Sequence, residues 1–442
     1  MLLYNCFIFL YASGIRFIAL WNRKARRWLD GRRDLFTQLQ LFSERTAHKR
    51  KVWVHCASLG EYEQGLPVLE KIKRQYPDHI TVLSFFSPSG YEVIAAKHPE
   101  DEIFYLPMDS KLHAKKFIDA IDPSLVIWVK YEYWFYYLTE LKRRNIPVLL
   151  VSGVFRKNQP FFQWYGSIWK KMLACFEHLF VQTPESAALL ASIGIADSVS
   201  ISGDTRFDRV IEIVSTAESL PDPIIAFCGS NKVIVAGSTW PEDEEELDHY
   251  ANKHPEIKFI LAPHEIDEAH LKEIEKLFHH SVRYSVFNPV KPGVANVLII
   301  DNIGLLSRLY RCADIAYIGG GFGADGIHNV LEPAVYGKPV VFGPEYEEFI
   351  EAVELIETGG GISIDNALEL EKILDELIDG VTLVNEPGSN GPAAQIVQTV
   401  TLIDGQPVTF SPGNAARNYV YSKAGASKKI MDYIQVKRLL MS

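Results

Sequence analysis

Short apolar runs alternate with longer amphipathic stretches from about residue 51 onward. The first four runs have the length and composition of buried strands and lie at residues 52–54, 80–83, 125–128 and 148–151. The segments between them have the length and apolar period of helices. Strands separated by helices predict a parallel sheet that is covered on both faces.

A second series of the same kind begins near residue 224. Its apolar runs lie at residues 233–235, 259–261, 297–300, 315–318 and 340–342. The sequence Pro221-Asp222-Pro223 interrupts any regular element, so a boundary is expected between residues 206 and 224. The pattern therefore predicts an α/β protein with two lobes, at 51–210 and 225–442. Ligands of open α/β sheets bind at the carboxyl ends of the strands, which places the expected site in a cleft between the lobes.

Residues 384–413 do not follow this rhythm, because they are rich in Gly, Pro, Asn and Ser. They enclose the sequence TVTLIDGQPVTF, which predicts two strands around an Asp404-Gly405 turn. We expect a surface hairpin inserted in the second lobe, without assignable chemistry. Residues 414–437 have helical composition and are expected to close that lobe.

The first 21 residues form a separate apolar segment that is borderline in length for crossing a bilayer. Basic residues follow it, and such flanks stay on the cytoplasmic side; they are Arg23, Lys24, Arg26, Arg27, Arg32, Arg33 and, further on, Arg45 to Lys51. We therefore expect a membrane anchor at 1–22 and a basic membrane-proximal segment at 23–50. A buried first helix is the alternative, and the pattern leaves open whether an anchor would span the bilayer or lie in its interface.

Charge and cysteine content exclude several classes of protein. The formal net charge is -10 over 442 residues, which argues against a protein that coats nucleic acid. The five cysteines lie far apart, without the spacing of a zinc site or a disulfide scaffold. Reduced thiols in a cytosolic domain are expected.

The strongest local motif is GGGFGADGIHNVLEPAVYGKPVVFGP, which begins at Gly319. Glycines after a strand let the backbone approach a ligand, and a following helix N-terminus can hold a phosphate. His328 and Glu332 are four residues apart and would share one helix face, with Asn329 beside them. Glycine needed only for tight turns, and a helix whose polar residues are merely solvated, are the alternatives.

Further candidates follow strands in both lobes. In HCASLGEYE, Ser58, Gly60 and Glu61 lie at a strand-to-helix turn, where Glu61 could act as a general base or simply stabilise the helix start. In WVKYEYW, Glu132 sits among aromatic residues, as in many sugar sites and also in many cores. Residues that could bond a phosphate, or belong to ordinary turns, are Ser238, Thr239 and His264.

In this order the motifs resemble those of the Kdo transferases, which move 3-deoxy-D-manno-oct-2-ulosonic acid from CMP-Kdo onto a lipid A precursor. The resemblance rests on the apolar N-terminus, ASLGE, the Glu132 motif, SGDTRFD and the long glycine-rich run, and it covers nearly the whole chain. It implies a GT-B fold with two Rossmann-like lobes, and an inverting, metal-independent transferase without a cofactor. It also implies the inner membrane, with the catalytic domains on the cytoplasmic side, and no nucleic-acid partner.

The resemblance also implies roles for individual residues. Glu61 matches the proposed catalytic base, and Ser58, Gly60 and Glu132 would lie on the acceptor side. The donor would be bound by Arg206, Ser238, Thr239, His264, Gly320, Gly321, Gly326, His328, Asn329 and Glu332.

Three features depart from the family pattern. Pro263-His264-Glu265 stands where many members have Pro-Arg-His, Arg206 replaces a common lysine, and residues 384–413 have no counterpart. Two other readings remain open at this point: a two-lobed enzyme that uses a UDP-sugar, either a lipid glycosyltransferase or an epimerase, and a non-catalytic membrane-associated binding protein.

Overall fold

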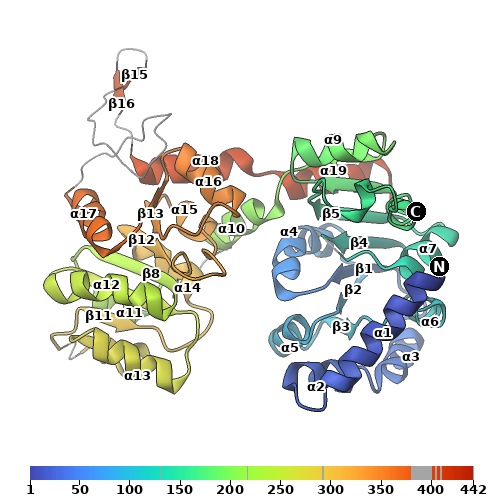
Figure 1. Cartoon of the computed structure of the whole chain (residues 1–442), viewed down its shortest axis with the longest axis horizontal. Helices are drawn as coiled ribbons and strands as arrows, with labels where there is room; N and C mark the ends of the chain where they lie inside the picture. Colours follow the sequence, from blue (N-terminus) through green and yellow to red (C-terminus); the bar gives the residue numbers. More distant parts are fainter. Residues whose placement is uncertain are drawn as a thin grey trace. The chain divides into compact units, whose positions relative to one another are not determined.

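The computed structural model describes residues 1–130, 132–216, 218–290, 293–379, 401–403, 406–408 and 411–441. It divides into two compact units: unit 1 contains Met1–Arg209 and Ala424–Ser442, and unit 2 contains Val210–Lys423. Each unit has one parallel seven-stranded sheet (Figure 1). The predicted α/β class is therefore confirmed. The chain passes from unit 1 to unit 2 inside helix α10 (Thr205–Thr216) and not at the proline pair near residue 222.

The sheet of unit 1 contains all four strands expected from the apolar runs and three more. In spatial order its strands are β3 (Glu102–Tyr105), β2 (Ile80–Phe85), β1 (Lys51–Cys56), β4 (Leu125–Val129), β5 (Val148–Gly153), β6 (His178–Val181) and β7 (Val199–Ile201). The helices of this unit are α1 (Leu2–Ile18), α2 (Arg23–Asp30), α3 (Leu35–Arg45), α4 (Leu59–Gln75), α5 (Pro88–Lys97), α6 (Lys111–Ile121), α7 (Phe135–Arg143), α8 (Ser167–Leu173), α9 (Pro184–Ser192) and α19 (Ala426–Val436), with a 3-10 turn at Pro160–Phe162.

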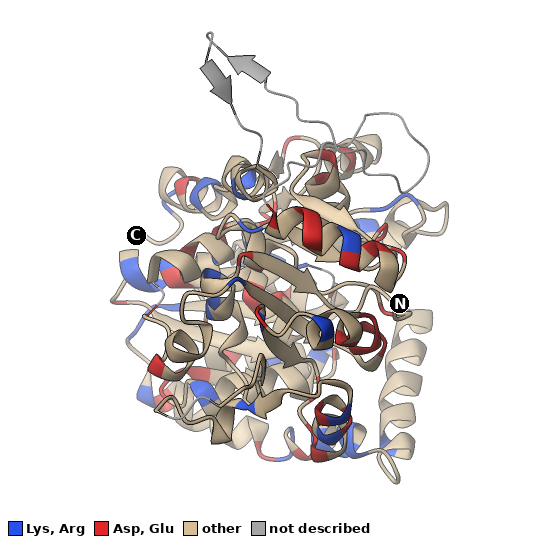
Figure 2. Cartoon of the chain, turned by 90° about the vertical axis from the view of Figure 1, so that its left-hand side faces the viewer, with Lys and Arg blue, Asp and Glu red and all other residues tan. Residues whose placement is uncertain are grey.

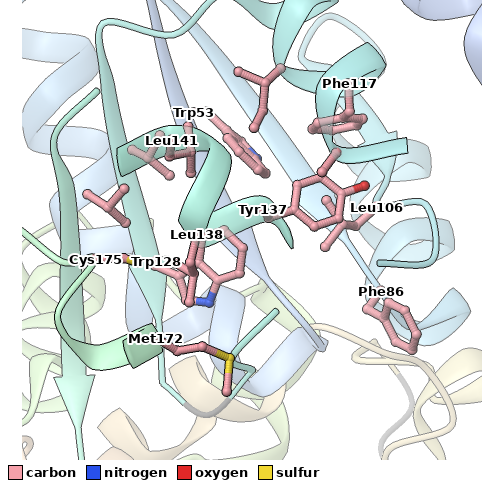
Figure 3. Close-up of a cluster of buried hydrophobic side chains, with 14 of the residues drawn as sticks. Trp53, Phe86, Leu106, Phe117, Trp128, Tyr137, Leu138, Leu141, Met172 and Cys175 are labelled. Atoms are coloured by element: carbon pink, nitrogen blue, oxygen red, sulfur yellow. The ribbon is translucent and has the colours of Figure 1, made fainter. Parts of the chain in front are cut away.

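Alternate residues of β1 and β4 enter two different cores. Trp53 and Trp128 pack on one face of the sheet with residues of α6 and α7, among them Tyr137 and Leu138 (Figure 3). Val52 and Val54 point to the other face, where α4 and α19 cover the sheet. A parallel sheet with both faces buried requires strands that are apolar throughout, and this explains why the strands read as continuous apolar runs.

The sheet of unit 2 has a related but different strand order. Its strands, in spatial order, are β10 (Ser281–Arg283), β11 (Val297–Ile299), β9 (Lys258–Pro263), β8 (Val233–Thr239), β12 (Ile315–Ile318), β13 (Val340–Phe342) and β14 (Gly361–Ser363). The order differs from that of unit 1 because β11 lies between β10 and β9. The helices are α11 (Asp222–Cys228), α12 (Pro241–Lys253), α13 (Glu268–Leu277), α14 (Leu306–Leu309), α15 (Leu331–Ala334), α16 (Ile350–Glu357), α17 (Ala367–Ile378) and α18 (Pro412–Lys423), with 3-10 turns at Tyr284–Val286 and Tyr310–Cys312.

The C-terminal helix differs from the expectation for residues 414–437. The segment forms two helices, because Gly425 has a φ of +109° and ends any continuous helix there. After this glycine, Ile430, Met431 and Ile434 of α19 pack into the core of unit 1. The prediction that the second lobe extends to residue 442 is therefore wrong for Ala424–Ser442.

The expected hairpin is present as β15 (Thr401–Ile403) and β16 (Gln406–Val408), which pair in antiparallel fashion. Its Asp404-Gly405 turn, and most of the remaining 384–413 segment, lie outside the described residues.

Helix α1 packs on unit 1 by one face only. Ile8 is buried there, and the Tyr4 hydroxyl donates to the Asp109 carboxylate. Most of the exposed surface of the helix is apolar, apart from Asn5 and Arg16. The large exposed apolar residues include Leu2, Leu3, Phe7, Phe9, Leu10, Phe17 and Ile18. Among the described residues no single helix has the length and hydropathy needed to cross a bilayer; α1 and α2 meet both criteria together but are bent by 118° where they join.

The prediction of a basic membrane-proximal segment at 23–50 is wrong for Arg32, whose side chain is mostly buried in unit 1. Its guanidinium donates to three main-chain carbonyls, with Nε 3.0 Å from Leu106 O, Nη1 2.9 Å from Trp28 O and Nη2 2.7 Å from Phe86 O. The Trp28 ring centroid lies 3.7 Å from its central carbon. Burial lowers the pKa of Arg32 to about 9. This side chain holds α2 against the sheet of unit 1 and is not available to a membrane surface.

Candidate active site

A chain of hydrogen bonds runs across the carboxyl ends of β1, β2 and β4 in unit 1. The Trp53 indole N–H donates to Ser84 Oγ at 2.8 Å, and Ser84 Oγ lies 2.8 Å from His55 Nδ1. On the other side of the same ring, His55 Nε2 lies 3.1 Å from Glu132 Oε2. Because an indole N–H can only donate, the Ser84 hydroxyl is free to donate to Nδ1. When Nδ1 accepts from Ser84, the proton of His55 lies on Nε2 and is donated to Glu132.

Glu132 receives a second donor from its own segment. The Trp134 indole N–H lies 2.9 Å from the same Oε2 atom, and the Trp128 indole N–H donates to the Glu132 carbonyl. The Glu132 side chain is 20% exposed, so a well-oriented carboxylate faces solvent among aromatic rings. The expectation that Glu132 lies in an aromatic setting is confirmed. Its neighbour Tyr131 lies outside the described residues.

Glu61 lies in the first turn of α4, directly after β1. Its side chain is nearly buried, and Oε2 accepts the main-chain N–H of Ala57. This is the geometry expected of a carboxylate that stabilises a helix start, which was one of the two readings of this residue. Ser58 is the N-cap of α4 but makes no capping bond with its side chain, and Gly60 is exposed. The other reading, a general base, requires a carboxylate at the carboxyl end of the sheet, and Glu61 occupies that place.

Three rings come together at the equivalent edge of unit 2. His264 stacks on Trp240 with ring centroids 4.8 Å apart, and on His328 with centroids 4.5 Å apart. The Trp240 indole N–H also lies 3.1 Å from His328 Nε2. The His264 ring is nearly parallel to both others, at interplanar angles of 23° to Trp240 and 21° to His328, so it stacks on each of two hydrogen-bonded rings.

The hydrogen bond from Trp240 decides the proton position on His328. Because the indole only donates, His328 Nε2 accepts, and the neutral ring carries its proton on Nδ1. Burial, and then the neighbouring His264, lower the pKa of His328 to about 4. His328 is therefore neutral at physiological pH, and Nδ1–H is its one donor toward a ligand.

The glycine-rich loop packs against the unit's own backbone. A Cβ on Gly320, whose φ is +93°, would lie 2.4 Å from Gly326 O, and one on Gly321 would lie 2.6 Å from Gly343 N. The Gly320 amide donates to Asp243 Oδ2 at 2.8 Å. The steric reading of these glycines is therefore supported, and the Gly320 N–H is already occupied. Gly326, with a φ of +74°, similarly has no room for a side chain, because Phe349 and Glu345 lie against it.

The predicted helix face shared by His328 and Glu332 is wrong. Helix α15 spans only Leu331–Ala334, so His328 and Asn329 precede it. The reason is local: the His328 amide donates to Gly319 O, and Asn329 Oδ1 accepts from Leu331 N at 3.1 Å to start the helix. Asn329 Nδ2 also donates to Glu332 Oε1 at 3.3 Å. The three residues remain neighbours, but a loop and the turn closed by the Asn329 side chain bring them together.

Ser238 and Thr239 end β8 and differ from each other. Ser238 has a φ of +56°, a strained conformation for a residue with a side chain, and is partly exposed. Thr239 is fully buried and donates its hydroxyl to Glu244 Oε1 at 2.9 Å. The Thr239 hydroxyl is thus engaged by the protein, so the structure leaves Ser238 as the better placed ligand group.

Arg206 lies at the start of α10 and belongs to unit 1, unlike the other donor candidates. Its Nε donates to Asp204 Oδ2 at 2.8 Å, and Asp204 is buried. Four residues with contacts at these sites were not among the predicted site residues: Asp204, His55, Ser84 and Trp240. Asp204 and His55 lie inside the motifs SGDTRFD and HCASLGEYE, and Trp240 follows Ser238 and Thr239, whereas Ser84 lies in no motif that the sequence singled out.

No group of three or more His, Cys, Asp or Glu side chains is arranged to hold a metal ion within the part of the chain that the structure describes. The histidines at the two sites are instead partnered by Ser84 and Glu132 in unit 1 and by rings in unit 2.

The sequence is similar to those of known transferases. Residues 33–209 match the family model of 3-deoxy-D-manno-octulosonic-acid transferases. A 3-deoxy-D-manno-octulosonic acid transferase of Aquifex aeolicus is 28% identical over 337 residues, which cover 75% of this chain and 86% of that protein. A bifunctional glycosyltransferase/methyltransferase of Fusobacterium nucleatum is 27% identical over 350 residues, 77% of this chain, and the match spans 53% of its length.

The fold has solved counterparts as well. UDP-GlcNAc 2-epimerase of Neisseria meningitidis superposes with a TM-score of 0.57 at 15% identity, covering 87% of this chain and 99% of the epimerase. At such low sequence identity, the similarity shows a shared fold and no more. The two Rossmann-like units give the chain a GT-B fold. The family model over residues 33–209 and the curated relatives across most of both units support the Kdo transferase family for this chain.

Proposed function

We propose that this protein transfers Kdo from CMP-Kdo to a lipid A precursor, with inversion at the anomeric carbon and with Glu61 as the general base. The observation that carries the proposal is the position of Glu61: a nearly buried carboxylate directly after β1, inside the segment that matches the transferase family.

The reaction balances with this chain's own groups. A hydroxyl oxygen of the acceptor attacks the anomeric carbon of Kdo while the bond from that carbon to the phosphate oxygen of CMP breaks. CMP leaves with the bonding electron pair, and Glu61 takes the hydroxyl proton. The bond that Glu61 receives from Ala57 N–H fixes the carboxylate in place before the acceptor arrives. Glu132, held by two N–H donors, serves the acceptor side.

The donor belongs to unit 2 in this proposal. Neutral His328 donates through Nδ1–H to the anionic donor, and Ser238 and Asn329 add short polar groups from neighbouring loops. His264, in place of the family's arginine, covers the site with a ring. Hydrogen-bond donors of this kind can stabilise a leaving phosphate without a metal ion, and we propose a metal-independent reaction.

We propose further that α1 lies in the membrane interface, at the cytoplasmic face of the inner membrane. One face of the helix packs on unit 1, and the exposed remainder is almost entirely apolar; in Figure 2 the helix at the N label is tan over most of its length. A row of aromatic rings connects this packed face to Glu132. The ring centroids of Tyr11 and Phe86 are 6.3 Å apart, and those of Phe86 and Trp134 are 5.0 Å apart. Trp134 in turn donates to Glu132. A lipid acceptor could therefore reach Glu132 without leaving the interface.

The test is transfer from CMP-Kdo to a tetraacylated lipid A precursor by the purified full-length protein in detergent, with EDTA present. Mass spectrometry of the products should show one or more added Kdo masses. The absence of both product and CMP release would contradict the proposal. Turnover of a UDP-sugar without any acceptor would favour the alternative, an epimerase of the kind that shares this fold.

A further inference from the structure

A second polar pocket lies at the opposite end of the unit 1 sheet, where β1 and β2 begin. Its volume is about 900 Å³. We call it the His79 pocket, and it is lined by His48, Lys49, Arg50, Gln75, Tyr76, Pro77, Asp78, His79, Ile80, Leu440 and Met441. None of these residues has a role in the transfer reaction proposed above.

Buried polar atoms border this pocket without a partner in the protein. Both ring nitrogens of His79 and the hydroxyl of Tyr76 are buried and make no hydrogen bond. Such atoms normally find a partner, because an unpaired buried polar group costs about 1–3 kcal/mol. Three unpaired atoms from two neighbouring side chains, whose rings meet edge-on at 5.8 Å, indicate a place for a polar ligand.

The positively charged side chains that line the pocket favour an anionic ligand. Lys49 and Arg50 contribute two full positive charges, and neither forms an ion pair with any residue that the structure describes. Asp78 is the one acidic side chain in the lining. Burial, and then the positive charge of Arg50, lower the pKa of His79. Leu440 supplies an apolar wall.

The pocket is also separate from the acceptor side. Residue 50 precedes β1 and Glu61 follows it, and the six residues of this strand put its two ends roughly 17 Å apart. A ligand in the His79 pocket therefore does not touch the reacting groups.

We propose that the His79 pocket binds a phosphate group through Arg50, Lys49, His79 and Tyr76. This chemistry fits inorganic phosphate and equally the phosphate of a phospholipid headgroup. The proposal does not depend on the transfer reaction, since it rests only on residues at the amino ends of β1 and β2.

The experiment compares wild type, Arg50→Gln and His79→Gln with Lys115→Gln, an exposed lysine of unit 1 outside the pocket. Full-length protein in detergent is titrated calorimetrically with inorganic phosphate. Each protein is then co-sedimented with vesicles of phosphatidylglycerol and phosphatidylcholine. Equal melting temperatures without phosphate exclude loss of folding, and because Arg50 is exposed its variant is expected to fold.

Saturable phosphate binding that weakens about tenfold in both pocket variants, but not in Lys115→Gln, would support the proposal with free phosphate as the ligand. Absent phosphate binding, with vesicle binding weakened in the pocket variants relative to Lys115→Gln, would support it with a headgroup as the ligand. Phosphate and vesicle binding equal in all four proteins, or absent in all, would overturn it.

Discussion

The two units place a histidine at the same edge of the same kind of sheet, but surround it differently. His55 in unit 1 is fully buried between the Ser84 hydroxyl and the Glu132 carboxylate. His328 in unit 2 faces an indole N–H and a second imidazole, and its pKa falls to about 4. Unit 1 thus presents carboxylates and unit 2 presents N–H donors.

This difference suits the two substrates of a sugar transfer. A hydroxyl nucleophile must lose a proton, and carboxylates accept protons. A nucleotide sugar carries negative charge, and N–H groups that cannot give up a proton near neutral pH stabilise it without reacting. Under the proposed function, acceptor chemistry belongs to unit 1 and donor binding to unit 2, and the following changes test that proposal.

The largest effect is expected for Glu61→Gln. Removing a general base typically lowers the rate by about 10²–10⁴-fold, and we expect a loss of about 10³-fold in kcat for transfer. Glu63→Gln is the matched control, because Glu63 lies two residues away, is exposed and pairs with Arg209 at 2.9 Å. Steady-state assays should show near wild-type activity for the control; similar losses in both variants would point to a structural effect.

Arg32→Met should destabilise unit 1 by about 3 kcal/mol. The change leaves three carbonyl acceptors without their donor, at about 1 kcal/mol or more each, while it keeps most of the side-chain volume. Arg33→Gln, one residue along and 75% exposed, should change the free energy of unfolding by less than about 0.5 kcal/mol. Denaturant melts compare the two. An unchanged midpoint for Arg32→Met would show that the guanidinium does not hold α2 to the sheet.

Trp240→Phe should raise the donor KM about tenfold with little change in kcat. The variant keeps the ring against His264 but removes the N–H that fixes the His328 proton on Nδ1. Trp164→Phe is the control, since Trp164 is 94% exposed. Nitrogen NMR shifts of His328 should report the Nδ1–H form in wild type and a mixture in Trp240→Phe; an Nε2–H form in wild type would contradict the assignment.

The last expected effect concerns pH. The unfolded chain protonates His328 near pH 6.5, whereas the folded protein does so only near pH 4. The unfolded state therefore binds more protons in this window, and stability falls as the pH is lowered from 6.5 to 4. Between pH 6.5 and pH 4, the melting temperature of wild type should therefore fall relative to that of His328→Gln. A constant difference between them across this range would show that the His328 pKa is not lowered.

Much of the fold is predictable from the sequence, because strands buried on both faces read as unbroken apolar runs. The strands that were missed are short or lie toward the sheet edges: β3, β6, β7, β10 and β14. The return of α19 to unit 1 was also missed, since helical composition does not reveal which core Ile430 and Ile434 enter. A single glycine with positive φ, Gly425, redirects the chain there.

The candidate sites were predictable in outline and not in detail. Glu61 and Glu132 follow strands, and that position could be read from the sequence. Their partners could not, because Ser84 and His55 come from different strands and meet only through parallel register. Likewise, the sequence pattern predicted His328 on a helix, whereas it lies in a loop before the short helix α15, next to the turn that the Asn329 side chain closes. Trp240 and His328 are 88 residues apart, a separation at which local pattern carries no information.

The central claim is that unit 2 binds the donor nucleotide and that unit 1 activates the acceptor. Its most direct test is the equilibrium binding of CMP to wild type, Glu61→Gln and His328→Gln, measured by calorimetry. The account predicts wild-type affinity for Glu61→Gln and at least about tenfold weaker binding for His328→Gln. Weakened CMP binding by Glu61→Gln, or unchanged binding by His328→Gln, would contradict it.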